Sequence, residues 1–408
     1  MTVSKSFRSS EPRRALMLGA GLMAAMAPAY GGDGDVLDTL QLHGFLSQAL
    51  VVTDDNDFFG PSSEGGGSLK FTEIGANVSL RPHEDVLIAA QVLSRRAGGD
   101  ASDASPELDY GLIDYQIQSN QQRNFGVQLG RFKNPFGFYN QTRDVAFTRP
   151  SVLLPQSIYF DRTRSLALSA DGVLTYFEER LSNGTLRFQA GVGQVQAGDD
   201  LRRTLRLDRF AGDLEPETSA IGQLRYEHDG GRIVAALGTA EVGAHFDSRQ
   251  PGLTDGDFYF RPWILSLQYN AGLWSLTGEY ALRESGLENF NDPRLNFDTI
   301  GESWYLQYTR RFLDDWQWLI RYDSLVSNRD DPDGKEFEAS VSGAIPAHTQ
   351  FAKDITLGLQ WTPHPRVLVS GEYHHVDGTG WLPIQDNPDP ADTERYWNML
   401  LFQLSLRF

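Results

Sequence analysis

The 408-residue chain contains no cysteine, and no run of 18 apolar residues occurs in it. The first absence excludes a disulfide scaffold, thiolate metal sites and a cysteine nucleophile. The second excludes a protein that crosses a membrane with helices. Basic residues are also scarce, because 36 Lys and Arg face 54 Asp and Glu and leave a formal net charge of −18. We therefore expect no nucleic-acid partner, since phosphate binding requires a basic face.

The N-terminus has the composition of an export signal. A basic start is followed by an apolar run, ALMLGAGLMAAMA, and by small residues ending at Ala29. This run is too short to span a bilayer. We predict a cleaved signal peptide over 1–29 and one mature domain over 30–408, exported to the outer membrane of a Gram-negative bacterium. Two adjacent arginines leave the twin-arginine route open beside the general one.

Beyond the signal, apolar and polar residues alternate with period two, which is typical of half-buried β-strands. Sixteen segments show this pattern and are expected to be strands, at approximately 40–52, 69–81, 86–96, 108–118, 124–133, 165–177, 185–196, 219–228, 232–243, 258–269, 273–283, 302–312, 316–326, 351–362, 366–376 and 396–408.

The connections between these segments alternate between short turns and long loops. Together with the even strand number, this predicts an all-β protein, a 16-stranded antiparallel transmembrane β-barrel with long extracellular loops. A soluble sandwich or propeller is the alternative. Against it, the second strand face is polar and suits a water-filled lumen. Aromatic residues also gather near strand ends, as in interface girdles; they include Trp263, Tyr269, Trp274, Tyr280, Trp304, Tyr308, Trp316, Tyr322, Trp361 and Tyr373.

The strand register predicts which charged residues line the lumen. If the apolar face is outward, the inward basic residues are Arg81, Arg95, Arg187, Arg225, Arg283, Arg321 and Arg407. The inward acids are Glu73, Asp171, Glu227, Glu279, Asp323 and Glu372. A wall of mixed sign suits a transverse field in a general diffusion pore more than a single-ion filter.

The third long connection, over 134–164, differs from the others. It is the longest, and it is rich in Phe, Tyr, Leu and Pro, so we expect it to fold into the barrel and narrow the lumen. From residue 131 to residue 164 it also carries a net charge of +4. Six basic residues are the candidate constriction site, where they would attract anions: Arg131, Lys133, Arg143, Arg149, Arg162 and Arg164. The alternative is that these residues pair with lumen carboxylates and only hold the loop.

Three pieces of the stretch from Gly130 to Glu178 carry a family resemblance: GRFKNPFGFYN, TRPSVLLPQSIYFDR and SADGVLTYFE. This region resembles proteobacterial outer-membrane porins related to the phosphate-selective porin family. The resemblance implies a homotrimeric channel with its third loop folded inward. Phosphate-selective members are expected to carry a lysine cluster, whereas this chain has five lysines in all.

Catalytic and metal-binding patterns are weak. The sequence has no GxSxG, HExxH or P-loop motif. His374 and His375 are adjacent on one strand, so their rings point to opposite faces and cannot share a metal. The acidic stretch from Asp330 to Gly334 lacks full EF-hand spacing and is interpreted as a solvated loop. We therefore expect no enzyme activity, no cofactor and no metal.

The sequence thus predicts a passive porin for small hydrophilic solutes with an anion-leaning constriction. A substrate-specific channel for phosphate or an organic acid and a non-channel structural or adhesive barrel remain alternatives. Expected partners are outer-membrane lipid and lipopolysaccharide, two further copies in a homotrimer, and the assembly machinery that reads a terminal strand ending in Phe408.

The acidity is confined to one part of the predicted topology. The seven other long connections hold 30 acidic and nine basic residues, a net charge of −21. The predicted mature chain carries the same −21, because the signal contributes +3. We therefore expect an acidic outer rim, bridged to lipopolysaccharide by divalent cations, around a constriction of the opposite sign.

Overall fold

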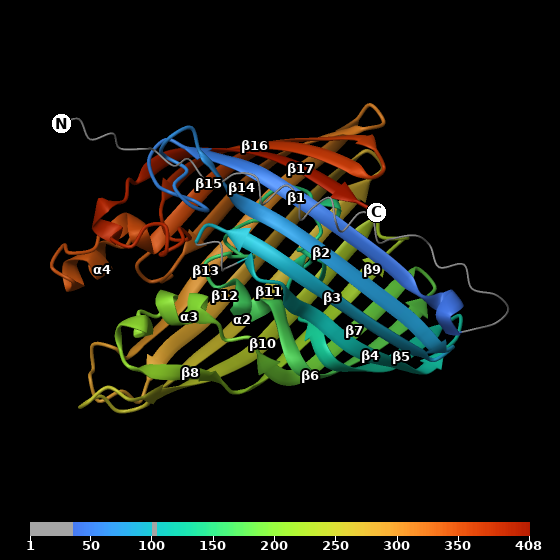
Figure 1. Cartoon of the computed structure of the whole chain (residues 1–408), viewed down its shortest axis with the longest axis horizontal. Helices are drawn as coiled ribbons and strands as arrows, with labels where there is room; N and C mark the ends of the chain where they lie inside the picture. Colours follow the sequence, from blue (N-terminus) through green and yellow to red (C-terminus); the bar gives the residue numbers. More distant parts are fainter. Residues whose placement is uncertain (1–35, 100–103) are drawn as a thin grey trace, which may run out of the picture.

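The alternating residues form seventeen β-strands that are joined in one antiparallel sheet. The computed structural model describes residues 36–99 and 104–408, and Figure 1 shows the sheet wrapped into a barrel. The strands are β1 Gln41–Thr53, β2 Ser68–His83, β3 Val86–Ala97, β4 Glu107–Ser119, β5 Arg123–Lys133, β6 Ser169–Leu181, β7 Gly184–Val195, β8 Gly212–Pro216, β9 Thr218–His228, β10 Ile233–Ser248, β11 Gly256–Ala271, β12 Trp274–Glu288, β13 Phe297–Phe312, β14 Trp316–Val326, β15 Phe351–His364, β16 Val367–Gly378 and β17 Tyr396–Arg407.

Two of these strands, β8 and β9, form a single wall strand. Both pair with β10, Pro216 opposite Ala244 and Ala220 opposite Glu241, and Glu217 interrupts the ladder between them. The wall therefore has the sixteen strands that the sequence predicts. Because β1 pairs with both β2 and β17, the sheet closes on itself and leaves no free edge.

Several predicted boundaries are wrong by four or five residues, among them the ends of β10 and β12 and the start of β13. The sixth strand is predicted over 165–177, but β6 begins at Ser169, and the preceding residues form the helix α2 Arg164–Leu168. The apolar residues Leu166 and Ala167 are buried on that helical turn, so their pattern imitates a strand. The predicted loop over 197–218 contains β8 and two short helices. The helices outside α2 are η1 Val36–Thr39, η3 Asn140–Thr142, η4 Ala146–Thr148, α3 Asp199–Thr204, η5 Leu207–Arg209, α4 Lys335–Ser340, η6 Ala347–Gln350 and η7 Pro390–Asp392.

The seam between the first and last strands is closed tightly. Gly44 and Phe408 exchange two backbone hydrogen bonds, with N···O distances of 3.2 and 3.0 Å. A Cβ atom added at Gly44 would lie 2.2 Å from Cζ of Phe408. The terminal ring therefore rests on position 44 because that residue has no side chain.

The outer face of the barrel is apolar, as the register predicts. Exposed hydrophobic residues follow alternate positions of every long strand, for example Ile74, Val78, Ile88 and Val92. Aromatic rings also stack between neighbouring strands, with Trp316 and Trp361 5.4 Å apart between ring centroids. A closed sheet with an apolar exterior satisfies its backbone internally and meets lipid, so the chain is an outer-membrane β-barrel protein.

The two ends of the barrel differ, as predicted. Connections of two to four residues lie at one end, and the long connections that carry α3 and α4 gather at the other (Figure 1). The seven acidic connections are all at this long-loop end. No helix in 36–99 or 104–408 has the length and apolar character needed to cross a membrane. The predicted signal peptide over 1–29 lies outside the described residues.

Candidate functional site

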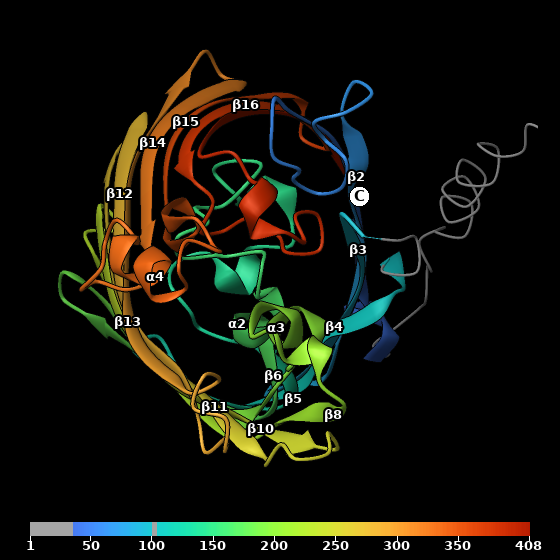
Figure 2. The same ribbon diagram turned by 90° about the vertical axis from the view of Figure 1, so that its left-hand side faces the viewer.

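The connection between β5 and β6 lies inside the barrel (Figure 2). It reaches acceptors on three strands of the opposite wall: the amide of Phe138 donates to Glu279 on β12 at 2.9 Å, and that of Ser157 donates to Asp323 on β14 at 3.3 Å. The amides of Val152 and Leu153 donate to Glu372 on β16. The inward fold predicted for 134–164 is therefore observed, and the segment extends to residue 168 because α2 precedes β6.

The apolar residues of this inserted segment, 134–168, are buried on both sides. Phe136, Leu154 and Ile158 belong to a cluster with the inner faces of β11 and β12. Val152 and Leu153 belong to a second cluster on the other side of the lumen. The segment thus packs against the wall, which explains why its composition is unlike that of a solvated loop.

Glu279 on β12 is the most heavily bonded acceptor under the segment. It accepts from the hydroxyl groups of Tyr159 at 2.6 Å and Tyr305 at 2.8 Å, and from Ser266 and the amide of Phe138. Burial and the adjacent carboxylate raise the pKa of Tyr159 well above its usual value, so its hydroxyl stays protonated and donates. This carboxylate anchors the segment to the wall.

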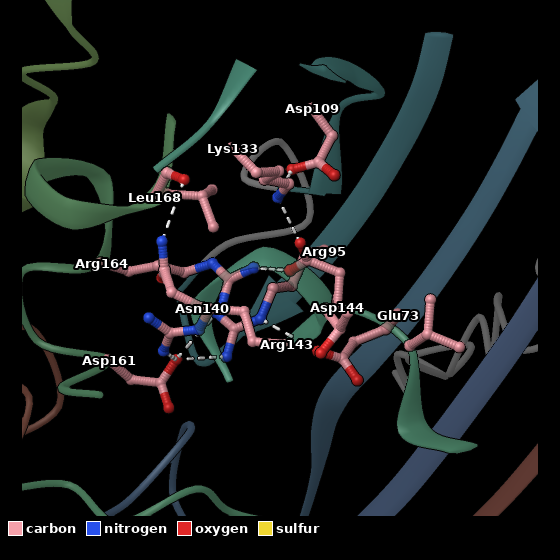
Figure 3. Close-up of polar contacts among 12 residues, drawn as sticks. Glu73, Arg95, Asp109, Lys133, Asn140, Arg143, Asp144, Asp161, Arg164 and Leu168 are labelled. Carbon is pink, nitrogen blue, oxygen red and sulfur yellow. Dashed lines mark hydrogen bonds and ion pairs between the residues drawn. The ribbon is translucent and has the colours of Figure 1, made fainter. Parts of the chain in front are cut away.

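Lys133, Arg143 and Arg164 lie in one buried network of charges (Figure 3). The ammonium group of Lys133 donates to both Asp109 and Asp144, and Arg164 also donates to Asp144. Nη2 of Arg143 donates to the carbonyl of Tyr159 at 2.9 Å and lies 3.7 Å from Asp161. Burial lowers the pKa of Arg143 to about 10.

Arg149 reaches across to the second strand. It forms a two-point contact with Glu73, at 2.8 and 3.4 Å, and this carboxylate is 1% exposed. Arg95 on β3 bridges the two parts of the network, because it contacts Glu73 at 3.3 Å and Asp161 at 2.7 Å. The charges of Arg149 and Arg95 are thus largely neutralised where they lie.

Arg131 is paired within the wall. It lies opposite Asp171 in the β5–β6 ladder and grips that carboxylate with Nε and Nη2 at 2.7 and 2.8 Å. A bidentate contact of this kind fixes the guanidinium plane. The charge of Arg131 is therefore already matched.

Arg162 has no carboxylate partner in the described part of the chain. Its Nη1 donates to the carbonyl of Gly380 at 3.2 Å, and its buried Nε has no hydrogen-bond partner. Burial, followed by the positive charge of Arg206, lowers the pKa of Arg162 to about 10. Of the six candidate residues, five are thus paired and one keeps an uncompensated charge.

The alternation pattern missed one acid of this network, Asp109. The β3–β4 register shifts between Gln91 and Val92, because β4 carries one extra residue there. A bulge reverses the inward and outward faces of the residues beyond it. Asp109 is consequently buried beside Lys133, although the alternation along the rest of β4 predicts that its side chain points outward. In the sequence, a break in the alternation around residues 108–110 was the only indication of this bulge.

Two cavities flank the inserted segment, and Arg162 and Thr204 line both. The larger has a volume of about 460 Å³ and is lined by five basic and five acidic residues. The smaller has a volume of about 240 Å³, and the charged residues that line it are Arg162 and Arg283. The lumen thus has a neutral mixed compartment and a purely basic one.

The predicted histidine geometry is observed, and the acidic loop has a structural use. His374 is buried between Asp354 at 2.8 Å and Glu372 at 3.3 Å, whereas His375 is exposed on the other face. Asp331 accepts the amides of Glu336 and Phe337 at the start of α4, which matches a solvated, capped loop. In the described residues, one grouping with metal-binding geometry is the exposed turn of His83, Glu84 and Asp85.

No protein-family model and no curated protein matches this sequence. Among solved structures, the chain is similar to an anion-selective porin from Comamonas acidovorans, with 12% identity and a TM-score of 0.56 over 90% of this chain and 99% of that one. It is also similar to the outer membrane channel DcaP of Acinetobacter baumannii, with 12% identity, a TM-score of 0.55 and coverage of 90% and 97%. OmpT of Vibrio cholerae matches with 11% identity, a TM-score of 0.55 and coverage of 90% and 97%. The fold is therefore that of a porin-like barrel, and the narrower resemblance to phosphate-selective porins stays a prediction.

Proposed function

We propose that this protein is a passive outer-membrane channel for small hydrophilic solutes, with a preference for anions at the inserted segment. The carrying observation is a closed barrel whose polar inner wall is narrowed by a segment holding one uncompensated arginine. Diffusion requires no catalytic residue, so the proposal assigns none. Two similar structures, those of an anion-selective porin and of an outer membrane channel, support it at the level of the fold.

Arg162 carries the anion preference in this proposal. It lines both cavities beside the segment, and no carboxylate of the described chain neutralises it. A fixed cation in a narrow part of a pore attracts anions and repels cations. Four of the other candidates, Lys133, Arg143, Arg149 and Arg164, chiefly hold the segment in place, because each donates to a carboxylate or contacts one. The fifth, Arg131, is paired with Asp171 within the wall.

The partner assignments belong to the same proposal. We place lipid on the apolar outer face and lipopolysaccharide, with divalent cations, at the acidic long-loop end. A homotrimer is supported by the likeness to the trimer form of OmpT of Vibrio cholerae (TM-score 0.53). The terminal strand ending at Phe408 would be read by the assembly machinery. The signal over 1–29 would direct export.

Planar-bilayer recording with a salt gradient tests the channel. We expect open-channel currents and a reversal potential of anionic sign, and we expect Arg162→Gln to reduce that potential. Arg261→Gln is the charge-matched control, because Arg261 is an exposed residue of β11 paired with Glu241 and Glu284. The absence of current would refute the channel and favour a structural barrel. A cationic reversal potential would refute only the anion preference.

A further inference from the structure

The smaller cavity has an unusual lining for a porin lumen. Its walls come from the end of the inserted segment, α3, and the long-loop halves of β11, β12 and β13. Five aromatic side chains contribute to it: Phe160, Phe258, Phe260, Phe297 and Trp381. Phe160 and Phe260 meet edge to face, with their ring centroids 6.3 Å apart. One side of the cavity is therefore an apolar surface that a hydrophilic solute alone does not require.

The same cavity contains two arginines and no acidic residue. Arg162 enters from the inserted segment and Arg283 from β12. Arg283 donates from Nη2 to the carbonyl of Val326 at 3.3 Å, and within the described residues neither guanidinium forms an ion pair. The Nε atom of each is buried without a hydrogen-bond partner. Asp323, whose charge acts on Arg283, accepts the amide of Ser157 and does not line the cavity.

The wall leaves room for the side chain of Arg283 because the residue opposite it is a glycine. Gly301 lies directly opposite it in the β12–β13 ladder. A Cβ atom at Gly301 would lie 2.9 Å from Nη2 of Arg283. The polar part of the lining is completed by five residues with hydroxyl groups: Thr163, Thr204, Ser285, Thr299 and Ser327. The cavity thus presents a positive, donor-rich side next to an aromatic side.

We propose that this cavity, formed by Arg162, Arg283 and the surrounding aromatic residues, binds a small organic anion with an apolar body, of the aromatic carboxylate class. The carboxylate would accept from Nη2 of Arg162 and Nη1 of Arg283, which donate to no acceptor within the described residues. The ring would lie against the phenylalanine side chains. The volume of about 240 Å³ is sufficient, since an apolar cavity of about 150 Å³ in another protein holds benzene.

This inference rests on the proposed channel function and refines it, because the cavity would be a stopping point for one class of permeant anion. A porin built only for hydrophilic solutes has no use for the aromatic side. Inorganic phosphate would meet the arginines but not the rings. It should therefore bind more weakly than an aromatic carboxylate.

Calorimetric titration of the full-length protein in detergent with sodium phenylacetate tests the site. We expect saturable binding, weaker binding of inorganic phosphate, and none of the neutral phenylacetamide. Arg283→Gln should weaken phenylacetate binding about tenfold or more, because it removes a charged hydrogen bond. Gly301→Ala should also weaken it while every charge is kept, because the added Cβ displaces the guanidinium.

Arg187→Gln is the matched control. Arg187 is a wall arginine on β7 whose buried Nε also lacks a partner, but it does not line the cavity. Its substitution should leave binding unchanged. Correct folding of each variant is checked by the shift in electrophoretic mobility between unheated and boiled samples.

The outcomes separate the two proposals. Currents without phenylacetate binding, or binding that Arg283→Gln and Gly301→Ala both leave intact, would overturn the organic-anion site and leave the channel standing. Equal affinity for phosphate and phenylacetate would overturn the aromatic part. Binding without any current would overturn the channel and retain the site.

Discussion

At the scale of single residues, a buried charge acts according to what it is paired with. The six basic residues of the predicted constriction look equivalent in the sequence, yet Arg149 holds Glu73 and Arg131 holds Asp171. Arg162 has only a backbone carbonyl. A buried charge that is already matched contributes little field to the lumen, so the selectivity should depend on the unmatched one.

The lowered pKa of Arg162 gives the channel an expected pH dependence. The pKa of about 10 belongs to a base, so its positive charge is complete below that pH and is lost as the pH rises through it. We expect the anion preference to be constant near neutrality and to decline between about pH 9 and 11. Reversal potentials measured across this range check the expectation.

The variant Arg162→Gln should start from a lower preference and show a smaller alkaline step. Arg143 has a similarly lowered pKa, but it lies beside Asp161 and lines neither cavity. A step of full size in Arg162→Gln would show that another group is responsible.

The residue scale also includes the anchor at Glu279. Glu279→Leu removes the acceptor of the buried hydroxyl groups of Tyr159, Tyr305 and Ser266, and leaves these donors without that partner. We expect the free energy of unfolding in detergent to fall by about 3 kcal/mol or more. Urea unfolding followed by tryptophan fluorescence measures it, with Glu241→Leu on the exposed face as the control. Equal losses in both variants would contradict the anchoring role.

At the scale of elements, the strands were more predictable than the contacts of the loop. Alternation gives sixteen strands and their outward faces, because lipid on one side and the lumen on the other impose period two on every strand. It failed at α2, where two buried apolar residues on a helical turn imitate a strand, and at the β4 bulge, which turned Asp109 inward. Both exceptions are adjacent to the inserted segment.

The composition of that segment predicted its inward fold, but not which charges would meet. Pairing of Arg149 with Glu73 joins residues 76 positions apart in the chain, and only the closed barrel brings them together. The basic cavity was equally hidden, since Arg283 was predicted to face inward without any indication that Gly301 and Arg162 lie around it.

Shortening the inserted segment is the test at this scale. Replacing residues 140–164 with a short Gly/Ser linker removes most of the apolar residues of the segment and all four of its arginines, so conductance should rise severalfold and the anion preference should decline. Single-channel recording measures both. Replacing α4, which lies beyond the long-loop end of the strands in Figure 1, should leave the current near that of the parent.

At the scale of the whole molecule, two fields of opposite sign act on a permeating ion. The acidic connections gather as a rim at the long-loop end, from which Asp199 and Asp200 reach the larger cavity, whereas Arg162 and Arg283 line the smaller cavity inside the barrel. The rim acts at a distance and is screened by salt, with a Debye length of about 30 Å at 0.01 M and about 3 Å at 1 M. The arginines act at contact distance and are screened much less.

The anion preference should therefore increase with ionic strength. At low salt the acidic rim enriches cations at the mouth of the channel and opposes the anion preference set by the arginines. At high salt the field of the rim is screened, and only the local field of the arginines remains. Reversal potentials at a fixed concentration ratio and rising mean concentration check this. A preference that weakens steadily as salt is added would mean that a diffuse positive field dominates.

The hydrogen bonds between the inserted segment and the wall carboxylates also depend on the circumference of the barrel. Glu279, Asp323 and Glu372 stand on β12, β14 and β16, and each accepts backbone amides from the same segment. In a flat sheet these acceptors would lie in a row, and only the curvature of this particular cylinder gathers them around one chain. A barrel with two strands more or fewer would have another circumference and would carry them out of reach of their amides. The hydrogen bonds of the segment that narrows the lumen are thus compatible with a barrel of this strand number and not with a wider or narrower one.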